Sequence, residues 1–189
     1  SEVLKIASMR KAVAYAIHEQ DVLANGYMND GVLSDTIYYP NFCGVMDEGS
    51  PYTFNPEKAA EILKKQGYRD SDNNGILETE EEEELEISIA VNKNNSSRLA
   101  AARVIQKNLQ NAGIKTVLDE LTWEDYQKAI SYGKHDIIVT GYAVNEQYDL
   151  RDFFNRKNEW GYYNEKLFAL AGEMEMLQTA EEYTKLYSD

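Results

Sequence analysis

In residues 85–142 the spacing of apolar residues alternates between that of β-strands and that of α-helices, and this feature constrains the fold more than any other. Short runs with the pattern of β-strands are separated by longer stretches with helical spacing. Connections of this length are typical of right-handed crossovers that join parallel strands. We therefore predict an α/β fold with a mainly parallel sheet, a β-α-β-α-β core and flanking helices. The pattern places strands at 85–91, 114–121 and 137–139, and helices at 96–112 and from Thr122 to Gly133.

The residues outside this core predict further helices and one long loop. Residues 6–25 have helical spacing, and a second helix begins at Asn55 and Pro56, which have the chemistry of an N-cap and a first turn. Residues 26–54 contain glycines, prolines and aromatics and predict an ordered loop, whereas 149–187 are helical and rich in aromatics. With no repeat and no flexible linker, residues 1–189 are predicted to form a single α/β lobe.

The charge balance excludes several classes of partner. The chain has 19 Lys and Arg against 33 Asp and Glu, for a net charge of −14. This sign disfavours binding to nucleic acid or to an anionic membrane surface. A single cysteine, Cys43, excludes an internal disulfide and the usual cysteine-based zinc sites.

The ends of the chain suggest a piece of a longer protein. Ser1 leads at once into a helical pattern, and the last residues, 181–187, lie inside another. Natural chains seldom start and stop within an element. We therefore expect an excised lobe whose partner lobe is absent.

Open parallel sheets bind ligands beyond the carboxyl ends of their strands. Two polar segments follow such strand ends, and an aromatic loop adds a further candidate. The predicted ligand-binding residues are Asn92, Asn94, Tyr142, Ala143, Asn145, Glu146 and the loop residue Tyr38. For residues 92–97 the alternative is a loop that only caps the next helix, since Asn and Ser are common N-caps.

Few residues suit catalysis. His18 is predicted near the end of the first helix, and His135 lies before the third strand, away from the expected crevice. Cys43 with a histidine would make a nucleophile and base, but nothing in the sequence brings them together. The sequence lacks a glycine-rich phosphate loop, a nucleophile elbow and an HExxH motif.

An acidic segment fits a calcium-binding loop. Residues 70–81 match D-x-[DN]-x-[DN]-G-x5-E at every position, which places ligand oxygens around a common centre. The predicted calcium ligands are Asp70, Asp72, Asn74, Ile76 through its carbonyl, Glu78 and Glu81. The flank is unusual, because a strand rather than a helix should follow. An Asx-rich turn without metal is the alternative, and residues 70–86 hold nine carboxylates and no cation. No cofactor is expected to be required, and calcium would be a structural staple.

Six ordered motifs resemble family 5 extracellular solute-binding proteins of ABC transporters, the dipeptide- and oligopeptide-binding family. Residues 9–18 resemble its R-x-A-[LIV]-x-Y-A-I-[DN] helix, and 55–68 its [DN]-P-E-K-A-x-x-L-L-x-x-x-G-[YF] motif, which an Asp-rich loop often follows. The remaining similarities are A-x-x-I-Q-x-x-L-x-x-[AI]-G-I-K near 101–115, W-x-x-Y at 123–126, D-[ILM]-x-[LIV]-x-G-W at 136–142 and G-Y-x-N-x-x-x-D-x-L near 161–170.

The resemblance implies a type II periplasmic-binding-protein lobe, here the second of two, and a function in binding rather than catalysis. In such proteins two lobes close on a solute and deliver it to membrane permease subunits. Members that bind peptides place an Asp shortly after the G-W pair to receive the α-ammonium. Here Tyr142 replaces Trp, Asn145 occupies the Asp position, and Glu146 is the nearest carboxylate. Relatives also carry nickel, sugars, opines and other small solutes.

The combined expectation is the substrate-binding component of an ABC importer, with a peptide as first choice of cargo. It would lie outside the cytoplasm, in the periplasm or lipid-anchored at the cell surface. Two alternatives remain open at this point. One is a calcium-stabilised extracellular interaction module without small-molecule cargo, and the other is a hydrolase that depends on Cys43.

Overall fold

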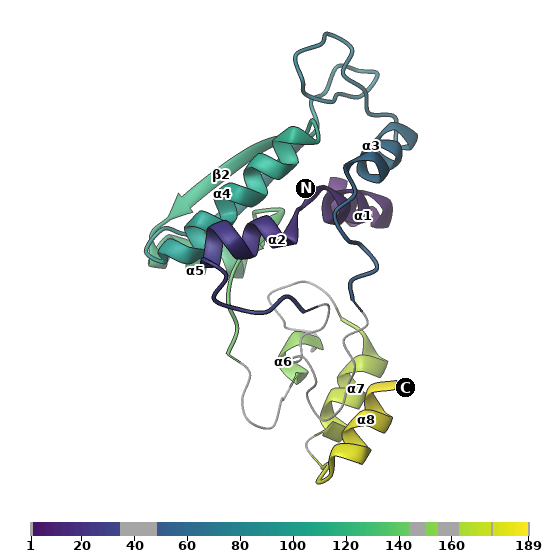
Figure 1. The fold of residues 1–189 in the computed structure, drawn as a ribbon, viewed down its shortest axis with the longest axis vertical. Helices are drawn as coiled ribbons and strands as arrows, with labels where there is room; N and C mark the ends of the chain where they lie inside the picture. Colours follow the sequence, from purple (N-terminus) through teal and green to yellow (C-terminus); the bar gives the residue numbers. More distant parts are fainter. Residues whose placement is uncertain (1, 35–48, 144–149, 155–162, 175, 189) are drawn as a thin grey trace. The chain divides into compact units, whose positions relative to one another are not determined.

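The computed structural model describes residues 2–34, 49–143, 150–154, 163–174 and 176–188 (Figure 1). The chain divides into two compact units. Unit 1 comprises Ser1–Leu33 and Pro51–Thr140, and unit 2 comprises Ser34–Ser50 and Gly141–Asp189. That residues 1–189 form one lobe stays a prediction.

The sheet of unit 1 is parallel, which confirms the predicted fold class. Strand β1 (Glu86–Asn92) lies between β2 (Lys115–Leu121) and β3 (Ile137–Val139), in the order β2-β1-β3. Ile89 of β1 aligns with Leu118 on one side and with Ile137 on the other. The strand bounds agree with the sequence pattern to within one residue.

Two crossover helices join the strands, and their ends follow the predicted capping chemistry. Helix α4 (Ser96–Asn111) begins where the Asn95 side chain accepts the Arg98 N–H, at 2.9 Å. Helix α5 (Trp123–Tyr132) begins with the Thr122 hydroxyl accepting the Asp125 N–H, at 3.2 Å. It ends at Gly133, which takes the left-handed conformation.

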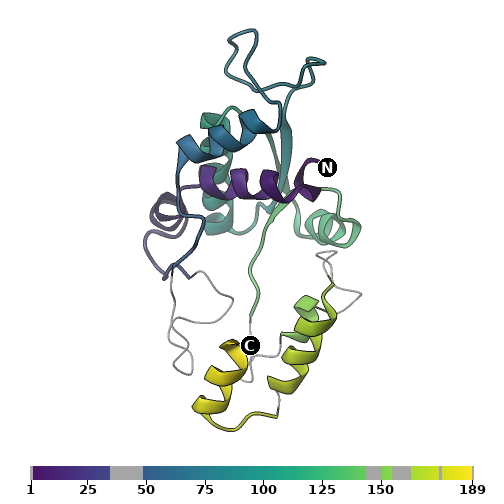
Figure 2. The same cartoon turned by 90° about the vertical axis from the view of Figure 1, so that its right-hand side faces the viewer.

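One apolar core holds most of unit 1 together. Helix α1 (Ala7–Ala16) lies beside α3 (Pro56–Lys65) and contacts α4, which packs against β1 (Figures 1 and 2). Buried side chains from all four elements, including one face of β1, form a single core. The members of this core are buried apolar side chains from these four elements and from two residues that directly precede strands. They are Met9, Ala12, Val13, Tyr15, Ala16, Ala59, Leu63, Leu85, Ile87, Ile89, Val91, Ala102, Leu109 and Ile114.

The prediction of one continuous helix over residues 6–25 is wrong. A short 3-10 turn (Val3–Lys5) precedes α1, which stops at Ala16, and the chain is extended at Ile17 and His18. It resumes as α2 (Glu19–Asp21) and then as a π-helix, η2 (Val22–Gly26). The reason for the break is tertiary. The His18 N–H donates to Asn108 Oδ1 of α4 at 2.9 Å, and the His18 ring packs on Phe54.

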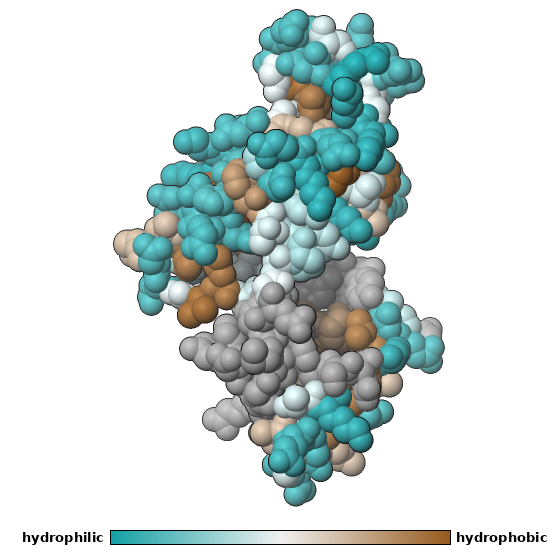
Figure 3. Space-filling view, turned by 45° about the vertical axis from the view of Figure 1, so that its right-hand side comes forward, coloured by the Kyte–Doolittle hydropathy of each residue, from teal (hydrophilic) through white to brown (hydrophobic). Residues whose placement is uncertain are grey.

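An acidic hairpin, residues 69–84, projects beyond the helices of unit 1 (Figure 1). Its outer surface is mostly hydrophilic (Figure 3). Backbone hydrogen bonds from Leu77 to Gly113 and from Leu85 to Leu77 attach its base to the turn before β2. The hairpin is therefore anchored at the amino edge of the sheet.

Unit 2 contains three described helices, α6 (Arg151–Phe154), α7 (Glu165–Met174) and α8 (Ala180–Ser188). They confirm the predicted helical character of the C-terminal part. Among the described residues of unit 2, Leu150, Ala171 and Met174 form a buried apolar cluster, with Phe153, Phe154, Leu177, Tyr183 and Leu186 packed around them. None of the helices in the described part of the chain is long and apolar enough to cross a bilayer.

Candidate functional site

The topology of unit 1 predicts where a ligand crevice would lie, because its two crossovers run in opposite directions. The chain moves from β1 outward to β2, and then back across β1 to β3. Crossovers between parallel strands are right-handed as a rule, so this reversal is expected to put α4 and α5 on opposite faces of the sheet. The crevice of an open α/β sheet lies at such a reversal, outside the carboxyl ends of the two adjacent strands. Here those ends are Asn92 of β1 and Thr140 after β3.

Asn92 has the properties of a ligand-facing group at this position. It is 6% exposed, and its Oδ1 accepts the Asn94 N–H at 2.9 Å. Among the described residues its Nδ2 has no hydrogen-bond partner, yet it is not one of the fully enclosed polar atoms. A buried amide with an unused donor at a solvent-reached edge is suited to a ligand oxygen.

Of the residues after Asn92, one caps the next helix and two have exposed side chains. Asn95 caps α4, as the capping alternative predicted, and its own N–H donates to the Asn92 carbonyl at 3.2 Å. The Lys93 N–H donates to the Leu121 carbonyl at 2.9 Å, which ties this turn to the end of β2. Lys93 and Asn94 are exposed. The turn is thus rigid in its backbone and open at its surface.

Trp123 is a candidate that the sequence reasoning missed. It begins α5 directly after β2, and it is 54% exposed even though it is large and apolar. Its ring lies 5.9 Å from that of Tyr126, whose hydroxyl donates to the Val139 carbonyl at 3.0 Å. Its place next to a strand's carboxyl end was visible in the sequence and is the signal that would have found it.

The other predicted ligand residues belong to unit 2. Tyr142 and Ala143 are exposed, and the Tyr142 ring makes an edge contact with Phe153, with ring centres 4.5 Å apart. Tyr142 is 49% exposed, so part of it is open to solvent. Tyr38, Asn145 and Glu146 lie outside the described residues.

Three carboxylates of the acidic hairpin converge. Oxygens of Asp70, Asp72 and Glu78 all lie within 4.8 Å of one another. Calcium binds oxygens at about 2.3–2.6 Å, so three oxygens at this separation can share one ion. The Asp70 carboxylate also accepts the N–H groups of Asn74 and Gly75, at 3.0 and 3.1 Å, which shapes the loop. The donor set therefore fits calcium, and the same contacts fit an Asx-rich turn.

The remaining predicted calcium ligands are arranged differently. The Asn74 Oδ1 accepts the Ile76 N–H at 2.6 Å, so it already has one partner within the loop. Glu81 is not in the converging group. Lys115 lies 2.7 Å from Glu84 and 3.0 Å from Glu86, and these two carboxylates raise its pKa. Part of the hairpin's charge is thus offset by β2, and calcium binding stays a prediction.

The two histidines are engaged in contacts that stabilise the fold. His18 Nδ1 lies 2.9 Å from Asp21, at the start of α2 rather than near a helix end. His135 Nε2 lies 2.8 Å from Asp119 on β2, at the amino side of β3 as predicted. Cys43 lies outside the described residues.

Comparison with known families gives one match over most of the chain. Residues 1–161 match the model of the family described as "Bacterial extracellular solute-binding proteins, family 5 Middle". Among curated proteins, the dipeptide-binding protein of Escherichia coli is 25% identical over 135 residues, which cover 71% of this chain and 24% of that protein. The oligopeptide-binding protein AppA of Bacillus subtilis is 21% identical over 99% of this chain and 36% of its own length.

Solved structures have the same fold. AppA from Bacillus subtilis, in complex with a nonapeptide, superposes with a TM-score of 0.80 at 21% identity, covering 99% of this chain and 39% of that one. NikZ from Campylobacter jejuni, in complex with Ni(L-His), superposes with a TM-score of 0.79 at 18% identity, covering 99% of this chain and 39% of that one. The chain therefore spans between a quarter and two fifths of the length of these relatives.

Proposed function

The chain belongs to the bacterial extracellular solute-binding proteins of family 5, and from this premise we propose that it supplies one wall of the solute site of an ABC importer. The closed protein would deliver its cargo to membrane permease subunits outside the cytoplasm. Family membership favours this function over a calcium-stabilised module without cargo and over a hydrolase that depends on Cys43. A lipid anchor stays a prediction.

The observation that carries the proposal is Asn92. It ends β1 beside the point where the crossover direction reverses, and its Oδ1 is held by the Asn94 N–H. With the side chain fixed in this way, Nδ2 presents a preorganised donor, and little rotamer entropy is lost when a ligand binds. A carbonyl or carboxylate oxygen, such as those of a peptide backbone, is the complementary group.

A peptide is the proposed cargo because of the side chains that follow the strand ends. Amide donors, exposed aromatics and few titratable groups suit an extended backbone that offers carbonyl oxygens and varied side chains. Trp123, just after the end of β2, would supply an aromatic surface. The named relatives include a dipeptide-binding protein and a nonapeptide complex, which supports the same class.

An isosteric substitution tests this role in the full-length protein. Asn92→Asp keeps the oxygen that accepts the Asn94 N–H but replaces the donor with a charged acceptor. The affinity for peptide should fall by about tenfold or more, since a lost hydrogen bond and an added repulsion each cost about 1 kcal/mol or more. Asn111→Asp, at the exposed end of α4, is the matched control.

Calorimetric titration against a peptide library distinguishes the outcomes. Tighter binding of a cationic solute by Asn92→Asp would show that a metal complex or an amine, not a carbonyl, occupies this point. Unchanged peptide affinity in Asn92→Asp would exclude contact between Asn92 and the cargo.

A further inference from the structure

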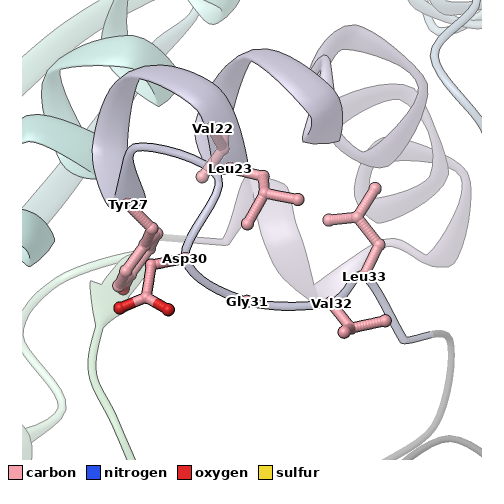
Figure 4. A pocket seen from close by; sticks show the side chains of 7 residues that line it. All are labelled: Val22, Leu23, Tyr27, Asp30, Gly31, Val32 and Leu33. Carbon is pink, nitrogen blue, oxygen red and sulfur yellow. The ribbon is translucent and has the colours of Figure 1, made fainter.

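Unit 1 has a pocket whose lining includes no strand residue. It lies on residues 22–33, which include η2 and the turn that follows, and has a volume of about 310 Å³ (Figure 4). This volume is at the small end of the range for ligand pockets. The lining residues are Val22, Leu23, Tyr27, Asp30, Gly31, Val32 and Leu33. None of them is among the residues predicted to bind a ligand at the strand ends.

The pocket is built on a fixed frame. Gly26 of η2 packs so closely on α4 that a Cβ there would lie 2.8 Å from the Ala101 Cβ. The Leu23 carbonyl accepts the N–H of Tyr27 and also that of Asn29, the latter at 3.1 Å. These bonds close the turn, and the backbone at Met28 and Asn29 is left-handed, with φ of 53° and 59°. Such backbone is uncommon outside glycine and persists where the surroundings enforce it.

The lining combines aliphatic walls with one charged group. Val22, Leu23 and Leu33 are half-buried, and in Figure 4 Tyr27 and Asp30 stand at one end of the lining while Val32 stands at the other. The Asp30 N–H donates to the Tyr27 carbonyl at 2.8 Å, which holds Asp30 beside the phenol. Among the described residues the Asp30 carboxylate has no ion pair or hydrogen bond of its own. Its charge is therefore available to a ligand.

This combination selects a ligand with two parts. A short methylene chain would cover the aliphatic walls, and a cation would meet the carboxylate of Asp30 and the ring of Tyr27. A neutral alkyl group would leave the carboxylate unpaired, and an anion would be repelled by it and by the net charge of −14. We propose that this pocket binds a straight-chain primary ammonium group, either of a free alkylamine or at the end of a lysine side chain.

The test is a titration of the full-length protein with n-pentylammonium chloride and with 1-pentanol, which has the same chain and no charge. The ammonium compound should bind at least about tenfold more tightly than the alcohol, with saturation at millimolar concentrations. Asp30→Asn should remove that difference. Glu57→Gln, an exposed carboxylate on α3, should leave it unchanged.

A second variant and a third ligand complete the experiment. Leu23→Ala should weaken both the ammonium and the alcohol, because it removes part of the aliphatic wall. Nα-acetyl-lysine amide distinguishes the sources: binding as strong as that of pentylammonium assigns the pocket to lysine side chains, and weaker binding assigns it to free amines. Equal affinities for ammonium and alcohol, or a preference that survives in Asp30→Asn, would overturn the proposal.

Discussion

The two edges of the sheet in unit 1 use polar groups in opposite ways. At the amino edge these groups satisfy one another: the Asp136 carboxylate accepts both the N–H and the hydroxyl of Ser88, at 2.9 and 2.8 Å. The base of the hairpin adds the bond from Leu77 to Gly113, at 2.8 Å. At the carboxyl edge, Asn92 has only its acceptor side engaged, and Trp123 is exposed.

This difference separates stability from binding. A buried polar group with all its partners inside the protein contributes to the free energy of unfolding, and its loss leaves a partner unsatisfied. A buried donor without such a partner contributes little to stability and is free to bind a solute oxygen. Substitutions at the amino edge should therefore change stability and spare cargo affinity, with the reverse at the carboxyl edge.

The largest effect is expected from Gly113→Ala at the amino edge. Gly113 has a φ of 80°, and a Cβ there would lie 2.8 Å from Leu77 Cγ. Backbone strain and the clash together should lower the free energy of unfolding by about 3 kcal/mol. Urea denaturation measures this change. Gly133→Ala is the control, because its φ is 57° but no atom lies within 4 Å, so only about 1 kcal/mol should be lost.

Asp136→Ala should have a smaller effect of about 2 kcal/mol, because it leaves the Ser88 N–H without its acceptor in the central strand. The same urea titration measures it. Peptide affinity of the folded variant should equal that of the parent. If the affinity instead fell while stability was retained, the division of roles between the two edges would be wrong.

Calcium should have the smallest effect of the three. A calcium concentration of ten times the dissociation constant would stabilise the protein by about 1.4 kcal/mol, seen as a rise in melting temperature. Asp70→Ala should abolish the rise, since Asp70 belongs to the converging carboxylates and also shapes the loop. A melting temperature that does not respond to millimolar calcium would leave the hairpin as an Asx-rich turn.

The core of the fold was predictable because its signals are local. Strand period, the caps at Asn55, Asn95 and Thr122, and the left-handed Gly133 all lie within a few residues of the elements they define. The break between α1 and α2 was not predictable, because it depends on a hydrogen bond to Asn108, which is 90 residues away along the chain. The π-helix and the pocket on it likewise depend on packing against Ala101.

The candidate site was predictable only in part. The rule about strand ends selected Asn92, and the structure has this residue at the end of β1, but its role in binding stays a prediction. The rule did not reveal that the Asn92 Oδ1 accepts the Asn94 N–H, whereas Nδ2 has no partner among the described residues. That distinction depends on rotamer and turn geometry, which sequence does not encode in a short pattern. The convergence of Glu78, rather than Glu81, with Asp70 has the same origin.

Hydrogen–deuterium exchange on the full-length protein, with and without saturating peptide, tests the central claim most directly. Cargo should slow exchange at the carboxyl edge, in segments 92–95 and 122–124, and in 140–146, while segments 113–115 and 134–136 at the amino edge keep their rates. Protection confined to the amino edge, or none in segments 92–95 and 140–146 despite binding, would contradict the account.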